Sequence, residues 1–358
     1  MVNRAPWIIA GVAAMLATGV AGGLARLGWQ VPSWGAVHHG FLMASVGFGS
    51  LITLERAVAI AQLGTRPSRV GPLTFPLASL LSGVLVLADF RSAAAVGALA
   101  AALWLLIISA RLYWRHRRPE FLLMGLGALS WCAATCQWWN RGWGREWIGW
   151  MCFLLLTVTG ERLDLSRFLR PSALKSTLFA VITLLLVVSA SGSLWGCRPC
   201  DALLGLSVVM LAGWLFFYDA ARFTLHRGGQ ASTSARSLLG GYAWLLISGL
   251  IMAWHGIPDS GWVRDAVMHS FFLGFVLMMV FAHGPIILPA LTPFKLRHHR
   301  RLEWPPLVMS LGLALRVAGD LGNVEWMRRW GGAGSAAALM VFALIAISLV
   351  ERGGAPRT

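Results

Sequence analysis

Charged residues are scarce in this sequence. They make up 12% of its 358 residues, whereas hydrophobic residues make up 57% and the mean hydropathy is +0.69. A soluble globular domain carries about 25% charged residues. The shortage excludes an ordinary soluble protein and predicts an integral membrane protein.

The sequence also lacks the signatures of several enzyme sites and of a domain boundary. It contains no serine nucleophile elbow, no phosphate-binding glycine loop and no zinc-protease motif. No polar linker long enough to separate two domains interrupts it, so we expect one transmembrane helical-bundle domain over residues 1–358. The first apolar run continues to about Leu27 without a convincing cleavage site, which favours a retained span over a signal peptide.

Long apolar runs fill most of the chain. Each has about 17 to 25 residues, the length that a helix needs to cross the hydrocarbon core, and they are too continuous for barrel strands. The twelve runs span residues 7–27, 38–61, 71–90, 93–113, 120–138, 146–165, 173–194, 202–223, 236–254, 263–290, 305–321 and 332–350. The predicted fold class is all-α, a polytopic integral membrane protein with about 12 transmembrane helices.

Arginine and lysine are concentrated in alternate loops. With a cytoplasmic N-terminus, more than two thirds of the 30 basic residues fall in cytoplasmic segments, and this bias orients membrane helices. We therefore expect an N-in, C-in, multi-pass protein of the bacterial inner membrane. The net charge of +16 then indicates insertion into, and contact with, an anionic lipid bilayer, and no nucleic-acid binding.

The stretch from Asp265 to Pro289 carries two histidines, His269 and His283, within one apolar run. Ligand-type side chains inside a membrane span are expensive and usually face a protein interior or a site. In an α-helix this separation brings both histidines to nearly the same face, about 21 Å apart along the axis. Such a helix is able to hold two haems, or a haem and a metal. Alternatively, each histidine hydrogen-bonds a neighbouring helix.

Three runs that are distant in sequence each deliver a histidine to the predicted outer face, namely His39, His255 and His269. Neutral imidazole is a common ligand of haem iron and copper. Either His39 and His269 are the two axial ligands of a haem b, or all three histidines hold copper. A third interpretation is that histidines merely favour interfaces. The runs at His39 and His269 also begin alike, as HGFLM and HSFFL, which is a weak internal repeat.

The predicted inner half contains a second group of polar residues. Met279 lies four residues before His283, and a thioether beside an imidazole suits copper, although methionine in an apolar helix more often fills the core. Acidic and basic residues at helix ends, including Arg162 and Asp219, favour an ion-pair network. A proton route towards His283 is the functional alternative.

Arg316 and Asp320 stand at i and i+4 in the eleventh run, where they are able to pair on one helix face. Near a haem, Arg316 is able to bind a propionate carboxylate instead. The motif Cys197-Arg198-Pro199-Cys200 lies in a predicted outer loop, where oxidising conditions favour a local disulfide. Glycines 47 and 49 are expected to permit close helix packing.

Four blocks of the chain resemble a family of twelve-span bacterial membrane proteins and, more distantly, the NnrS family: HGFLMASVGFGSLITLERAVAI, TVTGERLDLSRFLRP, DAVMHSFFLGFVLMMVFAHGPIILPA and LRVAGDLG. NnrS proteins contain haem and copper and are associated with nitric oxide metabolism. The resemblance implies haem b, copper and respiratory redox chemistry, with quinol or another membrane redox protein as partner. A cofactor-free transporter or channel with a histidine and carboxylate proton relay is the alternative, as is a structural subunit of a larger membrane redox complex.

Overall fold

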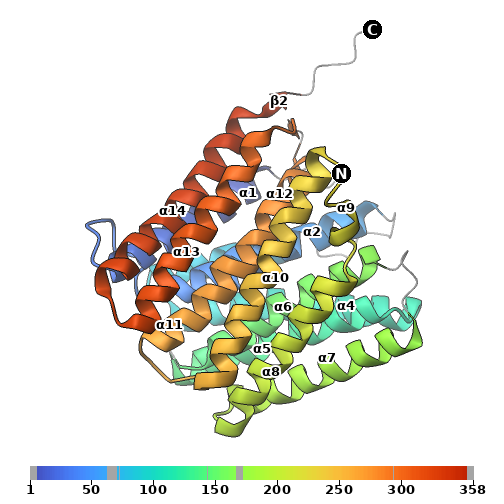
Figure 1. Cartoon of the computed structure of the whole chain (residues 1–358), viewed down its shortest axis with the longest axis horizontal. Helices are drawn as coiled ribbons and strands as arrows, with labels where there is room; N and C mark the ends of the chain where they lie inside the picture. The colour runs from blue at the N-terminus through green and yellow to red at the C-terminus, as the bar shows by residue number, and fades with distance from the viewer. Residues whose placement is uncertain are drawn as a thin grey trace. The chain divides into compact units, whose positions relative to one another are not determined.

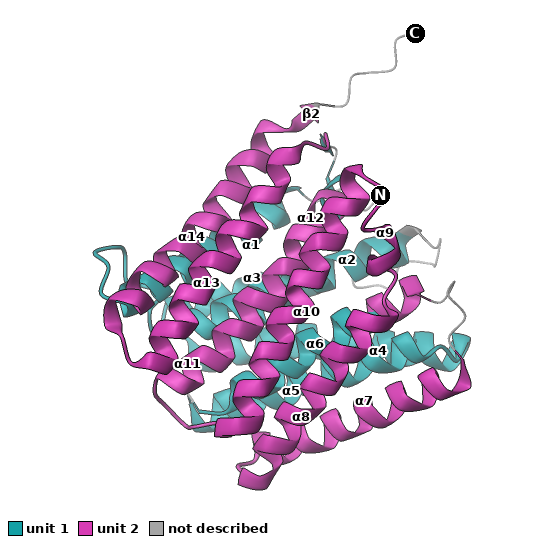
Figure 2. Ribbon diagram, viewed as in Figure 1, with its two compact units in different colours: residues 1–160, 287–295, 352–358 teal, residues 161–286, 296–351 magenta. Residues whose placement is uncertain are grey.

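A computed structural model describes residues 6–62, 71, 73–142, 144–166, 172–292 and 294–352 of the chain. Most of these residues are helical (Figure 1), which confirms the all-α class. The chain divides into two compact units (Figure 2). Unit 1 comprises residues 1–160, 287–295 and 352–358, and unit 2 comprises residues 161–286 and 296–351.

Unit 1 is built mainly from consecutive helices in the first part of the chain. They are α1 (Pro6–Arg26), the π-helical segment η1 (Phe41–Gly47), α2 (Phe48–Gln62), α3 (Thr74–Leu87), α4 (Arg91–His116), α5 (Pro119–Arg141) and most of α6 (Glu146–Ser166). Helices α3, α4 and α5 pack as successive neighbours, and α1 packs against η1. The short connection between α3 and α4 turns at Asp89, whose φ of 64° is left-handed.

Unit 2 contains the remaining helices. They are α7 (Ala173–Leu194), α8 (Arg198–Tyr218), α9 (Ala221–Thr224), α10 (Gly229–His255), α11 (Trp262–His269), the π-helical segment η3 (Ser270–Val276), most of α12 (Leu277–Leu291), the 3₁₀ segment η4 (Arg300–Glu303), α13 (Trp304–Gly322) and α14 (Glu325–Ser348). Helices α8 and α10 pack together, as do α13 and α14, and η3 packs against α10. Two short strands, β1 (Phe294–Leu296) and β2 (Val350–Arg352), form a small sheet.

Local sequence explains where the helices that carry the site begin and end. Helix α10 lies between Gly228 and Gly256, whose positive φ values of 72° and 68° are conformations that glycine adopts without steric cost. Helix α13 has proline in its first turn, where a missing N–H is tolerated, and it ends at Asn323 with a left-handed φ of 56°.

All twelve predicted apolar runs coincide with helical segments of the described residues. Nine helices in this part of the chain are long and apolar enough to cross a membrane, whereas α3 is a shorter apolar helix. The helical, multi-pass character follows from these findings. Twelve crossings with both termini inside stay a prediction.

Glycine lets helices approach closely in both units. A Cβ atom on Gly205 of α8 would lie 2.7 Å from the carbonyl oxygen of Gly249 in α10, and one on Gly249 would lie 2.9 Å from that of Gly205. In lipid, helices associate through such close packing because the tails are as apolar as the helix surface. The same role predicted for Gly47 and Gly49 is confirmed, since added Cβ atoms there would meet Leu16 and Trp131.

Candidate functional site

His39 is held against α1 in unit 1. Its Nδ1 lies 2.6 Å from the carbonyl oxygen of Gly19, and because a carbonyl only accepts, Nδ1 carries the proton. The Nε2 atom is then the nitrogen with the lone pair. Gly23 makes room for the ring, since a Cβ atom there would lie 2.9 Å from Cε1 of His39. Small residues of α1 therefore fix both the position and the tautomer of this imidazole.

His269 is the last residue of α11 in unit 2, and its tautomer is fixed in the same way. Its Nδ1 donates to the carbonyl oxygen of Asp265, one helical turn earlier, at 2.7 Å. The lone pair is again on Nε2. His39 and His269 thus have the same tautomer, although His39 donates to a carbonyl of another helix and His269 to one in its own helix, and they lie in different units. Their pairing on one haem stays a prediction.

A π-helical segment of seven residues follows each of these histidines. Such segments are rare, arise from i→i+5 hydrogen bonding and occur frequently at functional sites. In η1, Ser45 accepts a hydrogen bond from the indole N–H of Trp131 at 2.7 Å. In η3, Phe271 and Phe275 are fully buried. The similarity of HGFLM and HSFFL therefore corresponds to a similar local structure.

The segment η3 also changes one geometric expectation. The prediction that His269 and His283 share a face assumes 100° per residue throughout the helix. The seven residues between Ser270 and Val276 are wound in the wider π form instead. The common face and the axial spacing of about 21 Å therefore do not follow for this helix.

Arg328 of α14 organises the charged residues around α11. Its guanidinium donates to Asp265 at 2.9 Å and to Asp320 at 2.5 Å, and it lies 4.2 Å from the ring of Trp262. Asp320 also lies 3.8 Å from Nε of Arg316, the i,i+4 pair that the sequence predicts. Both Arg316 and Asp320 are buried. These contacts tie the helix that ends at His269 to α13 and α14.

His255, the remaining histidine of the predicted outer group, is the last residue of α10 and is exposed. A cationic or polar group at a helix C-terminus interacts favourably with the helix dipole. Within the described ranges, no group of three or more His, Cys, Asp or Glu side chains is arranged to hold a metal ion. The copper centre of His39, His255 and His269 therefore stays a prediction.

A buried ion pair lies in unit 2, on the side of the helices that the sequence predicts to be the inner one. Arg162 of α6 donates two parallel hydrogen bonds to Asp219, from Nε at 2.8 Å and from a terminal nitrogen at 2.7 Å. Only 6% and 1% of the two side chains are exposed. Asp219 ends α8 and also accepts the backbone N–H of Ala221 at 2.6 Å. The pairing that the sequence favours at this position is thus present.

His283 belongs to the same cluster. Its Nδ1 donates to the carbonyl oxygen of Met279 at 3.0 Å, and its Nε2 lies 3.1 Å from a terminal nitrogen of Arg162. A guanidinium only donates, so Nε2 must accept and the imidazole is neutral. Both ring nitrogens are therefore occupied by protein groups.

Met279 does not support the copper interpretation at this level. Its methyl carbon packs against Gly241 of α10, where an added Cβ atom would lie only 2.5 Å from it. The buried side chain of Met279 therefore fills the core between α12 and α10. With the lone pair of His283 directed at a cation, a copper ion would have to displace Arg162. The arrangement of His283 and Met279 in this structure does not fit a metal site.

Two residues of these clusters were not singled out by the sequence. Tyr242 of α10 is buried and interacts electrostatically with both Asp219 and Arg162. Arg328 looks like an ordinary loop cation in sequence. Arg328 is one of many basic residues near span ends, and Tyr242 lies inside an apolar span with no local pattern that shows its contact with Arg162. The predicted disulfide between Cys197 and Cys200 is confirmed.

Comparison with known proteins places the chain in a family but assigns no activity. No curated protein and no solved structure matches it. Residues 4–351 match the family model described as a domain of unknown function, DUF8744. Because this match covers nearly the whole chain, the protein belongs to the DUF8744 family.

Proposed function

We propose that this protein is a haem-binding redox protein of the bacterial inner membrane, with His39 and His269 as iron ligands. One observation carries the proposal: each imidazole donates Nδ1–H to a backbone carbonyl and so keeps its lone pair on Nε2. Metal-bound histidines almost always use this arrangement, which fixes the ring and raises its basicity. The chemistry of these two side chains therefore fits a haem b.

The chain's own residues position these ligands. Gly19 and Gly23 seat the His39 ring against α1. Arg328, held by Asp320, binds the helix of His269, so rotation of α11 would break the charged hydrogen bond to Asp265 and the cation–π contact with Trp262. When bound, a haem supplies one-electron transfer or the binding of a small gas such as nitric oxide.

Arg316 is kept as a candidate for a haem propionate. Its buried guanidinium is only 3.8 Å from Asp320, which already takes a closer contact from Arg328. Arg328 also contacts Asp265, so the two arginines of this cluster face two carboxylates. Arg316 stays a candidate because a guanidinium binds a carboxylate through paired, charge-assisted hydrogen bonds. For copper, the candidate ligands that remain in the proposal are His39, His255 and His269.

The test is a visible spectrum with iron analysis on the purified full-length chain. We expect a Soret band that is lost in His39→Gly and His269→Gly and restored by added imidazole, since imidazole replaces the missing ligand. His226→Gly, at an exposed histidine, serves as the matched control and should leave the spectrum unchanged. A colourless, iron-free protein produced under haem-replete conditions would overturn the proposal.

A double variant tests whether the two histidines serve one centre. Residues that act on the same centre are non-additive. His39→Gly combined with His269→Gly should therefore resemble either single variant. His283→Ala should leave the haem spectrum intact, because Arg162 and Met279 already occupy its nitrogens.

A second candidate function, a cofactor-free proton relay, is favoured by the cluster of Arg162, Asp219, Tyr242 and His283. Ionisable residues within membrane spans commonly mark proton or substrate pathways. The neutral imidazole of His283 and the buried hydroxyl of Tyr242 both adjoin one ion pair. Proton transfer through this cluster requires that Nε2 of His283 first leave Arg162, because both ring nitrogens are occupied in the arrangement described.

Proton flux into liposomes tests this second function. The full-length chain is reconstituted with a pH-sensitive dye inside, and a potassium diffusion potential drives the flux. The relay predicts flux that Tyr242→Phe and His283→Ala abolish and that Asp259→Asn, at an exposed ion pair, leaves unchanged. Flux no greater than that of empty liposomes would exclude the relay, whatever the haem content.

A further inference from the structure

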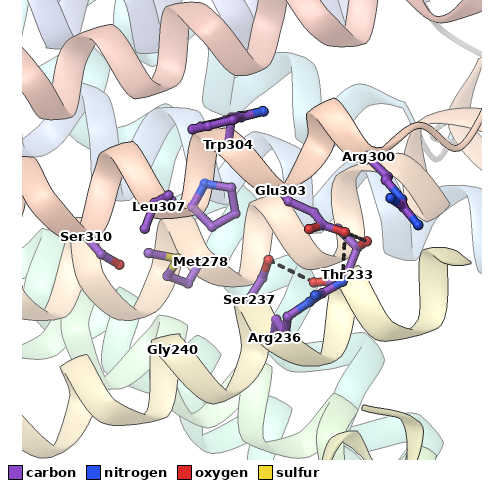
Figure 3. A pocket seen from close by; sticks show the side chains of 11 residues that line it. Thr233, Arg236, Ser237, Gly240, Met278, Arg300, Glu303, Trp304, Leu307 and Ser310 are labelled. Atoms are coloured by element: carbon purple, nitrogen blue, oxygen red, sulfur yellow. Dashed lines mark hydrogen bonds and ion pairs between the residues drawn. The ribbon is translucent and has the colours of Figure 1, made fainter. Parts of the chain in front are cut away.

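A groove of about 470 Å³ opens on unit 2 between α10, α12, η4 and α13 (Figure 3). The two ends of the groove differ in chemistry. Met278 and Leu307 gather at one end, whereas Glu303, Arg236 and Arg300 lie towards the other. Such a gradient from apolar to charged within one groove matches an amphipathic molecule.

The charged end is net positive. Glu303 accepts a hydrogen bond from Arg236 at 2.7 Å and one from the hydroxyl of Thr233 at 3.3 Å, so its charge is already compensated. Arg300 is exposed and adds a second positive charge beside this pair. It belongs to the segment 295–301, which contains four Lys or Arg residues and no acidic residue. This end is therefore complementary to an anion.

The apolar end is open to the surroundings of the helices. Leu307 is 50% exposed and Trp304, at the first residue of α13, is 59% exposed, whereas Met278 forms a buried floor. Tryptophan favours the level of the lipid headgroups, where its ring is apolar and its N–H meets water. The exposed Trp304 therefore marks this part of the groove as the expected level of the lipid headgroups.

We propose that this groove binds an anionic phospholipid. The phosphate contacts the guanidinium of Arg300, with Arg236 adjacent, and one acyl chain lies over Met278 and Leu307. Guanidinium groups bind phosphate oxygens through paired, charge-assisted hydrogen bonds, and basic pockets between membrane helices recognise lipid headgroups. The inference requires no haem and is independent of the proposed function.

Gly240 provides a way to fill the groove without disturbing the fold. It lines the groove from α10, and a Cβ atom added there would have no neighbour within 4 Å. Gly213 of α8 is matched in this respect, because a Cβ atom there also meets nothing within 4 Å, but it lies outside the groove. Gly240→Leu is therefore the test variant and Gly213→Leu its control.

Native mass spectrometry of the full-length chain in detergent measures the binding. Phosphatidylglycerol and phosphatidylcholine with identical acyl chains are the two probes. We expect phosphatidylglycerol to be retained at least about tenfold more tightly, the effect of one charge-assisted contact. Gly240→Leu should lower this binding by a similar factor, whereas Gly213→Leu should not. Arg300→Gln should remove the preference for the anionic headgroup.

Several outcomes would overturn the proposal. These are equal retention of the two lipids, unchanged binding in Gly240→Leu, and an equal loss in Gly213→Leu. If Gly240→Leu is recovered poorly, Leu307→Trp fills the groove from its half-exposed side and gives the same test. Lipid binding is measured without reference to haem, so absence of haem in the spectroscopic experiment would not change these outcomes. The haem proposal and the lipid proposal are therefore tested independently.

Discussion

Replacing Asp219 by Asn should destabilise the protein strongly. The substitution preserves the shape of the side chain and a carbonyl acceptor, but it removes the charge that compensates Arg162. The guanidinium remains 6% exposed, and Asp219 itself is 1% exposed, so water cannot solvate the remaining charge. Breaking such a buried pair costs about 3–5 kcal/mol of unfolding free energy.

The chain contains a matched control for this prediction. Arg198 and Asp259 also form an ion pair, but 58% and 63% of their side chains are exposed. An exposed pair contributes only about 0–1 kcal/mol. Asp259→Asn should therefore change stability by a small fraction of the loss in Asp219→Asn, although the same chemical change is made in the same unit.

Unfolding in mixed detergent with an increasing fraction of SDS gives the free energies. Arg162→Met added to Asp219→Asn should regain part of the loss, because it removes the uncompensated charge. Equal stability of Asp219→Asn and Asp259→Asn would refute the reasoning, and so would a double variant that loses the sum of both single changes.

Three further predictions address packing, the disulfide and the orientation. Gly205→Ala should lose about 1–3 kcal/mol through overpacking against α10, measured by the same unfolding assay, whereas Gly213→Ala should not. Cys197 and Cys200 should react with a thiol reagent only after reduction, and changing both to Ser should leave cofactor content unchanged. A cysteine placed at Arg117 should not be labelled from outside intact cells by a membrane-impermeant maleimide, because the loop is predicted to be cytoplasmic.

The helices of this protein could be predicted almost completely from its sequence. A continuous run of apolar residues that is long enough to cross a bilayer satisfies its backbone hydrogen bonds in lipid only as a helix. The composition of such a run therefore predicts a helix. The coincidence of twelve runs with helical segments reflects this constraint. The division into two units could not be predicted from composition, because it depends on which helices contact each other.

The candidate site was predictable only in part. The sequence identified His283, Arg162 and Asp219 as polar residues in an apolar setting, but not the direction of their contacts. Arg162 lies 121 residues from His283, and no local pattern shows that its guanidinium takes the imidazole lone pair. The π-helical form of η3 was also missed, because its residues are as apolar as those of an ordinary span.

His269 and His283 show which of their contacts depend on local sequence and which depend on a distant residue. His269 and His283 each donate Nδ1–H to the carbonyl oxygen four residues earlier, at 2.7 Å and 3.0 Å. This bond needs only a helix, so local sequence is enough to predict that Nε2 points away from the backbone. At His283 the guanidinium of Arg162 then takes Nε2, which turns a potential ligand into part of an ion-pair network. The local bond therefore sets the same tautomer at both positions, and the role of His283 is set by Arg162, a residue that lies far from it in the sequence.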